Sequence, residues 1–439
     1  MILLYVGIVI LLFFLTMSRA ESPQAAAQMV NQADVVVQFD NQAHLLRTIE
    51  FTQPISGLIA LQRSGLAVVI TETSFGPAVC SIEKVGCPAE NCFCDANRFW
   101  SYTYWDGSAW QSYAVGAGSS VISQTGAIEG WRWGEFGASQ IAPTQTLAAG
   151  QGLTWLQSRQ SITNGGYSGV SAAVETLMAI GANHIAANEW RRGATAPSLA
   201  DYVIGNSAAY ARNSAAGAGK LAVALAAADL CLPAGTLTPQ GHYSPTLGAY
   251  SKQSGPQSWA ILGAVAISET VPAPASSFLK QAQQANGGWE WAPGWGADTN
   301  ATALAIQALV ATGEPISAST VISGLAFVQA AQKGDGGFAY DLTVDATSDG
   351  NSTAYVVQAL LAAGEDPVGT RWTISNSNPI SYLLSLQLPD GSLQWQPQTG
   401  PNQLATQQAI PALLGRPYPI QRRLIQSCPT IYLPVIVNR

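Results

Sequence analysis

Charged side chains are scarce in this 439-residue chain, because Asp, Glu, Lys and Arg together make up only 10% of it. The 19 basic residues are outnumbered by 26 acidic ones, and the formal net charge is −7. No basic surplus is left to neutralise phosphate groups, so the composition excludes a nucleic-acid partner. It also disfavours attraction to acidic phospholipid surfaces.

Histidine is scarce too, and the strings that mark common catalytic sites are missing. The three histidines, His44, His184 and His242, have no neighbouring cysteine in the sequence, which argues against a zinc site built from Asp, Cys and His. The chain has no G-x-S-x-G elbow and no phosphate-binding glycine loop. We therefore expect no catalytic and no metal-ligating residues, and we favour a protein that is not an enzyme.

The first 20 residues predict export. An apolar run from Ile2 to Met17 is followed by small residues around Ala20, where a signal peptide would be cleaved. An uncleaved membrane anchor is the alternative. Later apolar runs are too short to span a bilayer, so the protein is expected to be secreted or extracytoplasmic, with membrane anchoring left open. The tail, residues 420–439, is interpreted as a surface tag or a final edge strand.

The six cysteines fit an exported chain, because an oxidising compartment allows disulfides to form. Cys80, Cys87, Cys92 and Cys94 lack the paired C-x2-C spacing of zinc ribbons, so we expect disulfides among them, in a pairing that the sequence leaves open. Cys231 and Cys428 are the remaining candidates. A bond between these two would attach the tail to the helical body.

Hydrophobic periodicity divides the chain into two parts. Residues 34–136 alternate apolar and polar positions in stretches such as "ADVVVQFD" and "FWSYTYWDGSAWQSYAV", which predicts a small β-rich domain. Residues 147–419 are Ala-rich, follow the helical period and are broken by Gly-rich turns. The boundary falls within residues 138–146.

The helical part repeats itself about every 50 residues. "FLKQAQQANGGW", "FVQAAQKGDGGF" and "YLLSLQLPDGSL" share an aromatic start, a Gln and a Gly, and each precedes a second, apolar helix. A two-helix unit cannot bury its own apolar face and must stack on its neighbours. We expect about six helix pairs closed into a ring, an (α/α)6 toroid, and hence a multidomain α+β protein.

The loops between paired helices hold the candidate ligand contacts. In "GGWEWAPGW" the glycines can end a helix and Trp289 can pack back on it, but helix capping requires neither Trp291 nor Trp295. Equivalent loops carry other aromatic and polar residues, and all should gather at one end of the ring. The candidate ligand-binding residues are Trp291, Trp295, Asp298, Tyr340, Asp341, Trp395, Gln398 and Asn402, with Trp110 from the β-rich domain.

The Gln-x3-Gly-x-aromatic repeats resemble those of the α/α-toroid superfamily, which includes squalene-hopene cyclases, protein prenyltransferase β subunits and the cobalamin carriers transcobalamin and intrinsic factor. The segments "CSIEKVGC", "RFWSYTYWDGSAWQSYAVG" and "GAIEGWRWG" are similar to the β domain of the cobalamin carriers, although here that domain precedes the toroid. This resemblance implies a noncatalytic binding protein, with a corrinoid such as cobalamin as its candidate ligand.

Two alternatives stay open. The first is a squalene-hopene type terpene cyclase acting on a polyprenyl substrate, although the D-x-D-D acid motif of that branch is missing from the sequence. The second is a cell-surface interaction scaffold without a small ligand. The binding-protein hypothesis and the cyclase alternative both predict a small-molecule or lipid-like partner. The scaffold alternative does not.

Overall fold

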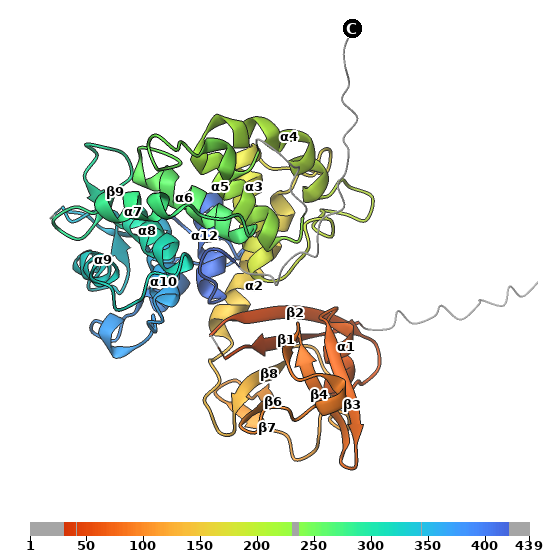
Figure 1. The fold of residues 1–439 in the computed structure, drawn as a ribbon. Coiled ribbons are helices and arrows are strands. Elements are labelled where there is room, and N and C mark those ends of the chain that lie inside the picture. Colours follow the sequence, from red (N-terminus) through yellow and green to blue (C-terminus); the bar gives the residue numbers. More distant parts are fainter. Residues whose placement is uncertain (1–29, 41, 231–236, 344, 421–439) are drawn as a thin grey trace, which may run out of the picture.

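The computed structural model describes residues 30–40, 42–230, 237–343 and 345–420 (Figure 1). The predicted export segment, Cys231, Cys428 and the tail beyond residue 420 lie outside these residues, so their roles stay predictions. Strands dominate the first part of the chain and helices the second, which confirms the mixed α and β class.

The β-rich part is built on one five-stranded sheet with the strand order β2-β1-β8-β6-β7. β1 pairs antiparallel with β2 and parallel with β8, although the two strands of the parallel pair lie far apart in sequence. One face of the sheet buries Val35, Val37, Trp131 and Trp133, as the alternating pattern requires. The strands are β1 (Asn31–Gln38), β2 (His44–Phe51), β6 (Arg98–Trp105), β7 (Trp110–Ser112) and β8 (Ala127–Glu135).

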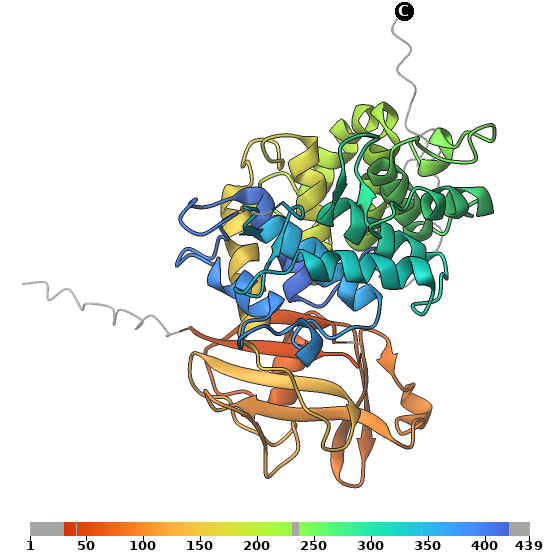
Figure 2. The ribbon, with the colours of Figure 1, turned by 90° about the vertical axis from the view of Figure 1, so that its left-hand side faces the viewer.

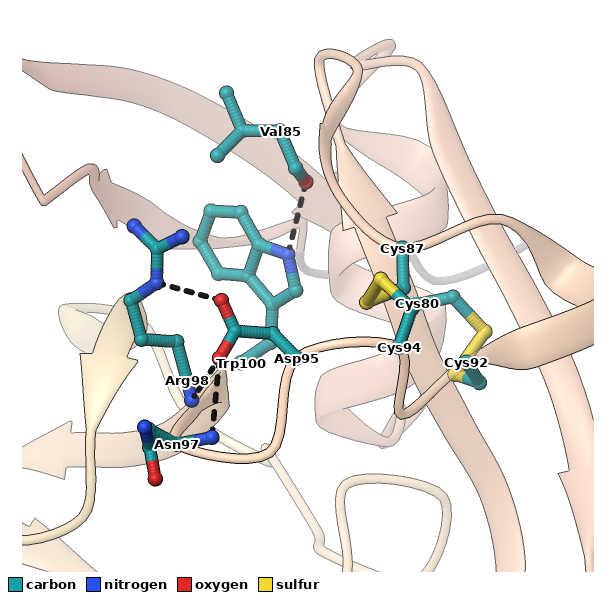
Figure 3. Close-up of a disulfide and its surroundings, with 9 residues drawn as sticks. All are labelled: Cys80, Val85, Cys87, Cys92, Cys94, Asp95, Asn97, Arg98 and Trp100. Atoms are coloured by element: carbon teal, nitrogen blue, oxygen red, sulfur yellow. Dashed lines mark hydrogen bonds and ion pairs between the residues drawn. A yellow bond between two sulfur atoms is a disulfide. The ribbon is translucent and has the colours of Figure 1, made fainter.

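A smaller sheet, β3-β4-β5, and helix α1 complete this part. Disulfides join Cys80 to Cys92 and Cys87 to Cys94, which is the pairing that the sequence leaves open (Figure 3). The first bond ties strand β4, and the second ties the residue after β5, to the segment that leads into β6. The elements are α1 (Gly57–Arg63), β3 (Val68–Thr73), β4 (Gly76–Ile82), β5 (Val85–Gly86) and η1 (Ala89–Asn91).

The helical part has an inner and an outer set of helices. The inner helices are α3 (Val170–Ala182), α5 (Ala215–Ala227), α6 (Ser254–Ala266), α8 (Thr299–Ala311), α10 (Gly350–Ala362) and α12 (Gln403–Leu413). The outer helices are α2 (Thr144–Arg159), α4 (Leu199–Asn213), α7 (Ala273–Gln281), α9 (Ser319–Ala330) and α11 (Pro379–Ser385). Two short 3-10 helices, η2 (Pro239–His242) and η3 (Thr370–Trp372), lie in the connections.

Each inner helix packs against the next, in the order α3, α5, α6, α8, α10 and α12, and α12 also packs against α3. The inner helices are buried on nearly all sides; in α8, every residue from Ala301 to Leu309 is buried. This agrees with their apolar sequence, because a helix without a polar face must be enclosed by its neighbours.

The repeated glutamine fastens each unit to the next one. In every copy its amide donates to the carbonyl of the turn glycine and to a carbonyl of another unit, so it satisfies two backbone acceptors. The pairs of acceptors are Gly165 and Trp190 for Gln160, Gly287 and Thr320 for Gln283, Gly336 and Trp372 for Gln332, and Gly391 and Ala148 for Gln387. The bond from Gln387 to Ala148 joins the final repeat to α2, the first helix of the helical part.

The β-rich part lies against one end of the helical part (Figure 2). β2 is an edge strand, and its free side is covered: the Leu46 N–H donates to Asn183 Oδ1 at 2.8 Å, and Asn183 Nδ2 donates back to the Leu46 carbonyl. The His44 N–H bonds to the carbonyl of Leu414 at 2.9 Å. Asn183 and Leu414 are the C-terminal caps of α3 and α12, so the β-rich part contacts the C-terminal ends of these inner helices.

Candidate functional site

Three loops of the helical part share one construction. After the glycine turn a residue donates its N–H to a threonine hydroxyl of the following inner helix: Trp289 to Thr302, Phe338 to Thr353 and Leu393 to Thr406. Trp289 also donates its indole N–H to the Leu279 carbonyl at 2.7 Å and is fully buried on α7. This agrees with its predicted role as a structural joint.

An aromatic residue follows two positions after each of these residues. Its backbone carbonyl accepts a hydrogen bond from the first turn of the preceding inner helix. The N–H groups of Gly255, Thr299 and Gly350, at the starts of α6, α8 and α10, donate to the carbonyls of Trp291, Tyr340 and Trp395. The Trp291 ring lies directly on Gly255, where a Cβ atom would meet the ring at 2.3 Å. Three aromatic side chains are thus placed at the N-terminal ends of neighbouring inner helices.

The loop that carries Trp295 is fixed by Glu290. Its Oε2 accepts the backbone N–H groups of Gly294 at 2.8 Å and Gly296 at 3.3 Å. Trp295 itself is 72% exposed.

The loops end in polar caps of the inner helices. Asp298 caps α8, Asp349 caps α10 and Asn402 caps α12, each through a side-chain oxygen that accepts an N–H of the first turn. Two short strand pairs place Asp298 opposite Trp289 and Asp349 opposite Phe338, so each aspartate lies across from the residue two positions before a loop aromatic. The pairs are β9 (Trp289–Glu290) with β10 (Ala297–Asp298), and β11 (Phe338–Ala339) with β12 (Ser348–Asp349).

These elements enclose an open cleft of about 420 Å³ at the N-terminal ends of α8, α10 and α12. Its walls combine aromatic rings with carboxyl, amide and hydroxyl groups. The lining residues are Trp291, Trp295, Asp298, Asn300, Leu304, Tyr340, Asp349, Asn351, Ser352, Tyr355, Trp395, Leu404 and Gln408.

Asp298 has an unusual environment. It is 3% exposed, and its Oδ1 accepts the Ala301 N–H at 2.7 Å. Tyr340 is close enough for the two groups to affect each other's pKa, but Oδ2 receives no hydrogen bond of normal geometry. Burial, opposed by the capping bond, raises the pKa of Asp298 to about 6. Burial and the nearby carboxylate raise the pKa of Tyr340 to about 12.

Asp349 is the second buried carboxyl group of the cleft. Burial raises its pKa, although both of its oxygens accept hydrogen bonds from Ser352 at 2.8 Å. Beside it Asn351 donates to Gln408 Oε1 at 2.6 Å, and Gln408 donates to the Tyr355 hydroxyl at 3.2 Å. This amide and hydroxyl chain links α10 to α12 across the floor of the cleft.

Five of the residues singled out in the sequence meet in this cleft: Trp291, Trp295, Asp298, Tyr340 and Trp395. Three others from the same loops do not line it. Asp341 turns to its own loop and accepts the Thr343 N–H at 2.9 Å. Gln398 is exposed at a loop tip, in the left-handed region at φ 68°. Asn402 uses its side-chain oxygen to cap α12.

Trp110 is also outside the cleft, so the structure does not bring it together with the other candidates. It lies on β7, where its indole packs edge-on against Trp105 and donates to the Ile141 carbonyl at 2.9 Å. It therefore fastens the chain segment between the two parts. The β-rich part as a whole contacts the C-terminal ends of α3 and α12, whereas the cleft lies at the N-terminal end of α12.

Eight residues that line the cleft were not singled out in the sequence as candidate ligand contacts. Most stand in the first two turns of an inner helix, one or a few residues after a cap, and the repeat register could have pointed to them. They are Asn300, Leu304, Asp349, Asn351, Ser352, Tyr355, Leu404 and Gln408. Periodicity indicates which residues are helical, but not which residues at a helix end line a cleft and which ones pack against neighbouring helices.

Within the described ranges, no group of three or more His, Cys, Asp or Glu side chains is placed to hold a metal ion. In the same residues no helix is both long and apolar enough to cross a membrane.

Comparison with known proteins gives structural similarity without a sequence family. No protein family matches the chain, and no curated protein does. A type II terpene cyclase from Scytonema is similar at a TM-score of 0.40 and 15% identity, over 62% of this chain and 96% of that one. A protein from Actinoplanes reaches a TM-score of 0.40 and 13% identity, over 62% of this chain and 99% of that one.

A third similar structure is an ent-copalyl diphosphate synthase from Streptomyces platensis, with a TM-score of 0.36 and 16% identity. The match covers 63% of this chain and 52% of that chain. At these levels the similarities assign neither an activity nor a substrate, so the function is argued from the cleft.

Proposed function

We propose that this chain is a small-molecule-binding protein whose ligand enters the cleft at the N-terminal ends of α8, α10 and α12. One observation carries the proposal: three consecutive loops place Trp291, Tyr340 and Trp395 around the buried carboxyl groups of Asp298 and Asp349. Rings for packing and a few oriented polar groups are the usual composition of a ligand site. The volume of about 420 Å³ lies in the range of such sites.

The proposal takes the helical part as a ring of paired helices whose open end forms the site. The β-rich part contacts the other end of α12, so in this arrangement it does not close over the ligand. A corrinoid remains the specific candidate from the resemblance, but the cleft can accept only an edge of so large a macrocycle. A smaller amphiphilic ligand fits the space better.

The test uses N-phenyl-1-naphthylamine, a neutral dye whose fluorescence increases in apolar surroundings. We expect saturable enhancement with the wild-type protein and a large loss in the double variant Trp291→Ala, Trp395→Ala. Trp110→Ala is the matched control, because it removes an equal ring outside the cleft. Equal enhancement in all three proteins would place the dye elsewhere and contradict the proposal.

A parallel measurement decides the corrinoid question. The wild-type protein is incubated with hydroxocobalamin, desalted and examined by visible absorption. Retention of the corrin bands that weakens in the double tryptophan variant supports a corrinoid ligand. Dye binding without retained corrin bands supports the smaller ligand, and failure of both probes favours the surface scaffold.

A second candidate function is acid-initiated cyclisation of a polyprenyl chain. The observation that favours it is a carboxyl group, Asp298, that burial keeps partly protonated near pH 6 among aromatic rings. The protein is incubated with squalene or geranylgeranyl diphosphate and the extract is analysed by gas chromatography and mass spectrometry. A cyclised product that disappears in Asp298→Asn supports catalysis, and an unchanged substrate with the wild-type protein argues against it.

A further inference from the structure

The cleft carries acidic groups without a cationic counterpart. Its described lining contains the carboxyl groups of Asp298 and Asp349 and no Lys, Arg or His. The interactions that set the pKa values of these two carboxyls are burial and hydrogen bonds, and none comes from a basic side chain. A carboxylate in such surroundings gains most from a ligand that brings the missing positive charge.

The cleft also holds acceptors that the protein leaves unpaired. Asp298 Oδ2 and Asn300 Oδ1 are buried from solvent. Oδ2 receives no hydrogen bond of normal geometry, although the Tyr340 hydroxyl is close to the Asp298 carboxyl, and Asn300 Oδ1 accepts none within the described structure. Both residues line the cleft. The oxygens of Asp349, by contrast, are both used by Ser352. Buried acceptors are normally paired, so two open ones in residues that line one cleft indicate a ligand that supplies N–H or O–H donors.

Aromatic faces surround these acceptors. Trp291, Trp295, Tyr340, Tyr355 and Trp395 all line the same space. The electron-rich faces of such rings attract a cation, and the attraction is stronger where the cation is shielded from water. The aromatic walls therefore favour the same sign of charge as the carboxylates do.

We propose that the cleft recognises a protonated primary amine, whose N–H groups donate to Asp298 Oδ2 and Asn300 Oδ1 while aromatic rings pack around its carbon skeleton. This inference rests on the proposed function, because it names the chemical class of ligand for the same site. It requires the ligand to combine an alkylammonium group with an apolar body.

Three probes of one shape separate charge from hydrogen bonding. Benzylamine is protonated at neutral pH, benzyl alcohol is its uncharged counterpart, and benzyltrimethylammonium carries the charge without N–H donors. Dissociation constants are measured by ligand-observed NMR titration. With the wild-type protein we expect benzylamine to bind about tenfold more tightly than benzyl alcohol, with benzyltrimethylammonium between them.

Two isosteric variants locate the effect. Asp298→Asn removes the charge and keeps a side chain that can cap α8, so we expect it to bring the affinity for benzylamine down to that for benzyl alcohol. Asp341→Asn removes the same charge from the neighbouring loop but outside the cleft. It should leave both affinities unchanged within about twofold, because exposed charges are screened.

The pH profile is an independent readout. Benzylamine should bind less tightly as the pH falls below about 6, because protonation of Asp298 removes its charge. The other titratable groups that line the cleft are Asp349, Tyr340 and Tyr355. The two hydroxyls stay protonated throughout, since burial raises both of their pKa values, and Asp349 shifts the profile in the same direction as Asp298.

The outcomes distinguish this inference from the proposed function. If benzyl alcohol binds as tightly as benzylamine, or if Asp298→Asn does not alter the preference, the amine class is wrong while ligand binding stands. Binding of N-phenyl-1-naphthylamine without any binding of the benzyl probes also overturns the amine class alone. If neither the dye nor a benzyl probe binds, both ideas fail.

Discussion

At the scale of single residues, Asp298 combines a structural and a chemical role. One of its oxygens caps α8, and the other is buried without a hydrogen bond of normal geometry. A capping side chain is held in place by its backbone partner, so the free oxygen is positioned before any ligand arrives. The two roles can be separated by substitution.

The capping role predicts a difference between two substitutions. Asp298→Ala should lower the free energy of unfolding by about 1 kcal/mol, because the N–H of Ala301 loses its acceptor. Asp298→Asn should lose much less, because an amide oxygen can accept the same bond. Urea denaturation followed by circular dichroism measures both at pH 4, where Asp298 is protonated in the folded state and its buried charge does not enter the comparison. Equal losses in the two variants would mean that the cap contributes little.

The raised pKa of Asp298 predicts a pH effect on stability. The folded protein binds this proton up to about pH 6, whereas the unfolded chain releases it near 3.8. The folded state therefore holds more protons between these values, and the contribution of Asp298 to stability falls as the pH rises through this window. The loss should be about 3 kcal/mol, since each pKa unit corresponds to about 1.4 kcal/mol.

The matching control is the same denaturation series on Asp298→Asn, which cannot titrate. The difference in unfolding free energy between the two proteins should change between pH 4 and pH 7 and level off above that. A difference that does not vary with pH would show that Asp298 has an ordinary pKa.

At the scale of the element, the helix pair is the repeating unit, and its turn is defined by a glutamine and a glycine. Gln283 bonds to the carbonyls of Gly287 and Thr320, and Gly287 adopts φ 89°. The sequence spacing showed that this unit recurs. It could not show that the glutamine bonds to the following unit, because that contact forms only when the units stack.

Removing the glutamine amide should weaken the stacking of units. Gln283→Leu keeps the size of the side chain but leaves two part-buried carbonyls without their donor. We expect a loss of about 1–3 kcal/mol in the free energy of unfolding. Gln398→Ala, at an exposed loop tip, should change it by less than about 0.5 kcal/mol. Chemical denaturation of both variants decides the point.

Two glycines separate backbone strain from steric fit. Gly287 and Gly294 have φ values of 89° and 86°, so alanine is strained at either position. A Cβ atom at Gly287 would lie 2.4 Å from the Ser323 carbonyl oxygen, whereas one at Gly294 meets nothing within 4 Å.

We therefore expect Gly294→Ala to lower the free energy of unfolding by about 1 kcal/mol and Gly287→Ala to lower it by at least about twice as much. The shifts in the midpoint of thermal unfolding should show the same order. Equal shifts in the two variants would mean that the α9 backbone moves aside without cost.

At the scale of the whole molecule, the two parts form a continuous structure through the edge of β2. His44 is fully buried at this junction, and its Nδ1 lies 2.8 Å from the Thr146 hydroxyl at the start of α2. Burial, together with the positive charge of Arg416, lowers the pKa of His44 to about 3. The folded junction thus requires neutral histidine.

Acid should consequently destabilise the molecule through His44. The unfolded chain binds a proton at this histidine below about pH 6.5, while the folded chain does so only near 3. Stability is therefore complete above pH 6.5 and declines as the pH falls, by up to about 1.4 kcal/mol per pH unit. Calorimetry of the wild-type protein and His44→Gln between pH 7 and pH 4 should show a weaker pH dependence in the variant, and parallel profiles would contradict this.

Much of this protein follows from its sequence, because local patterns determine local structure. Alternation predicts the β-rich part, a repeat of about 50 residues predicts stacked helix pairs, and the repeated loops predict that Trp291, Tyr340 and Trp395 are equivalent and gather at one end. These features depend on spacing along the chain, and spacing is visible without coordinates.

Tertiary structure alone decided the rest, because it depends on contacts between distant segments. In the folded chain Asp298 is buried and one of its oxygens receives no hydrogen bond of normal geometry, which no local pattern records. The β-rich part pairs its edge strand with the C-terminal ends of α3 and α12, so Trp110 is directed away from the cleft. Burial and the contact between the two parts depend on which surfaces pack together. A single sequence shows which residues are apolar or polar, but not which distant segments they contact.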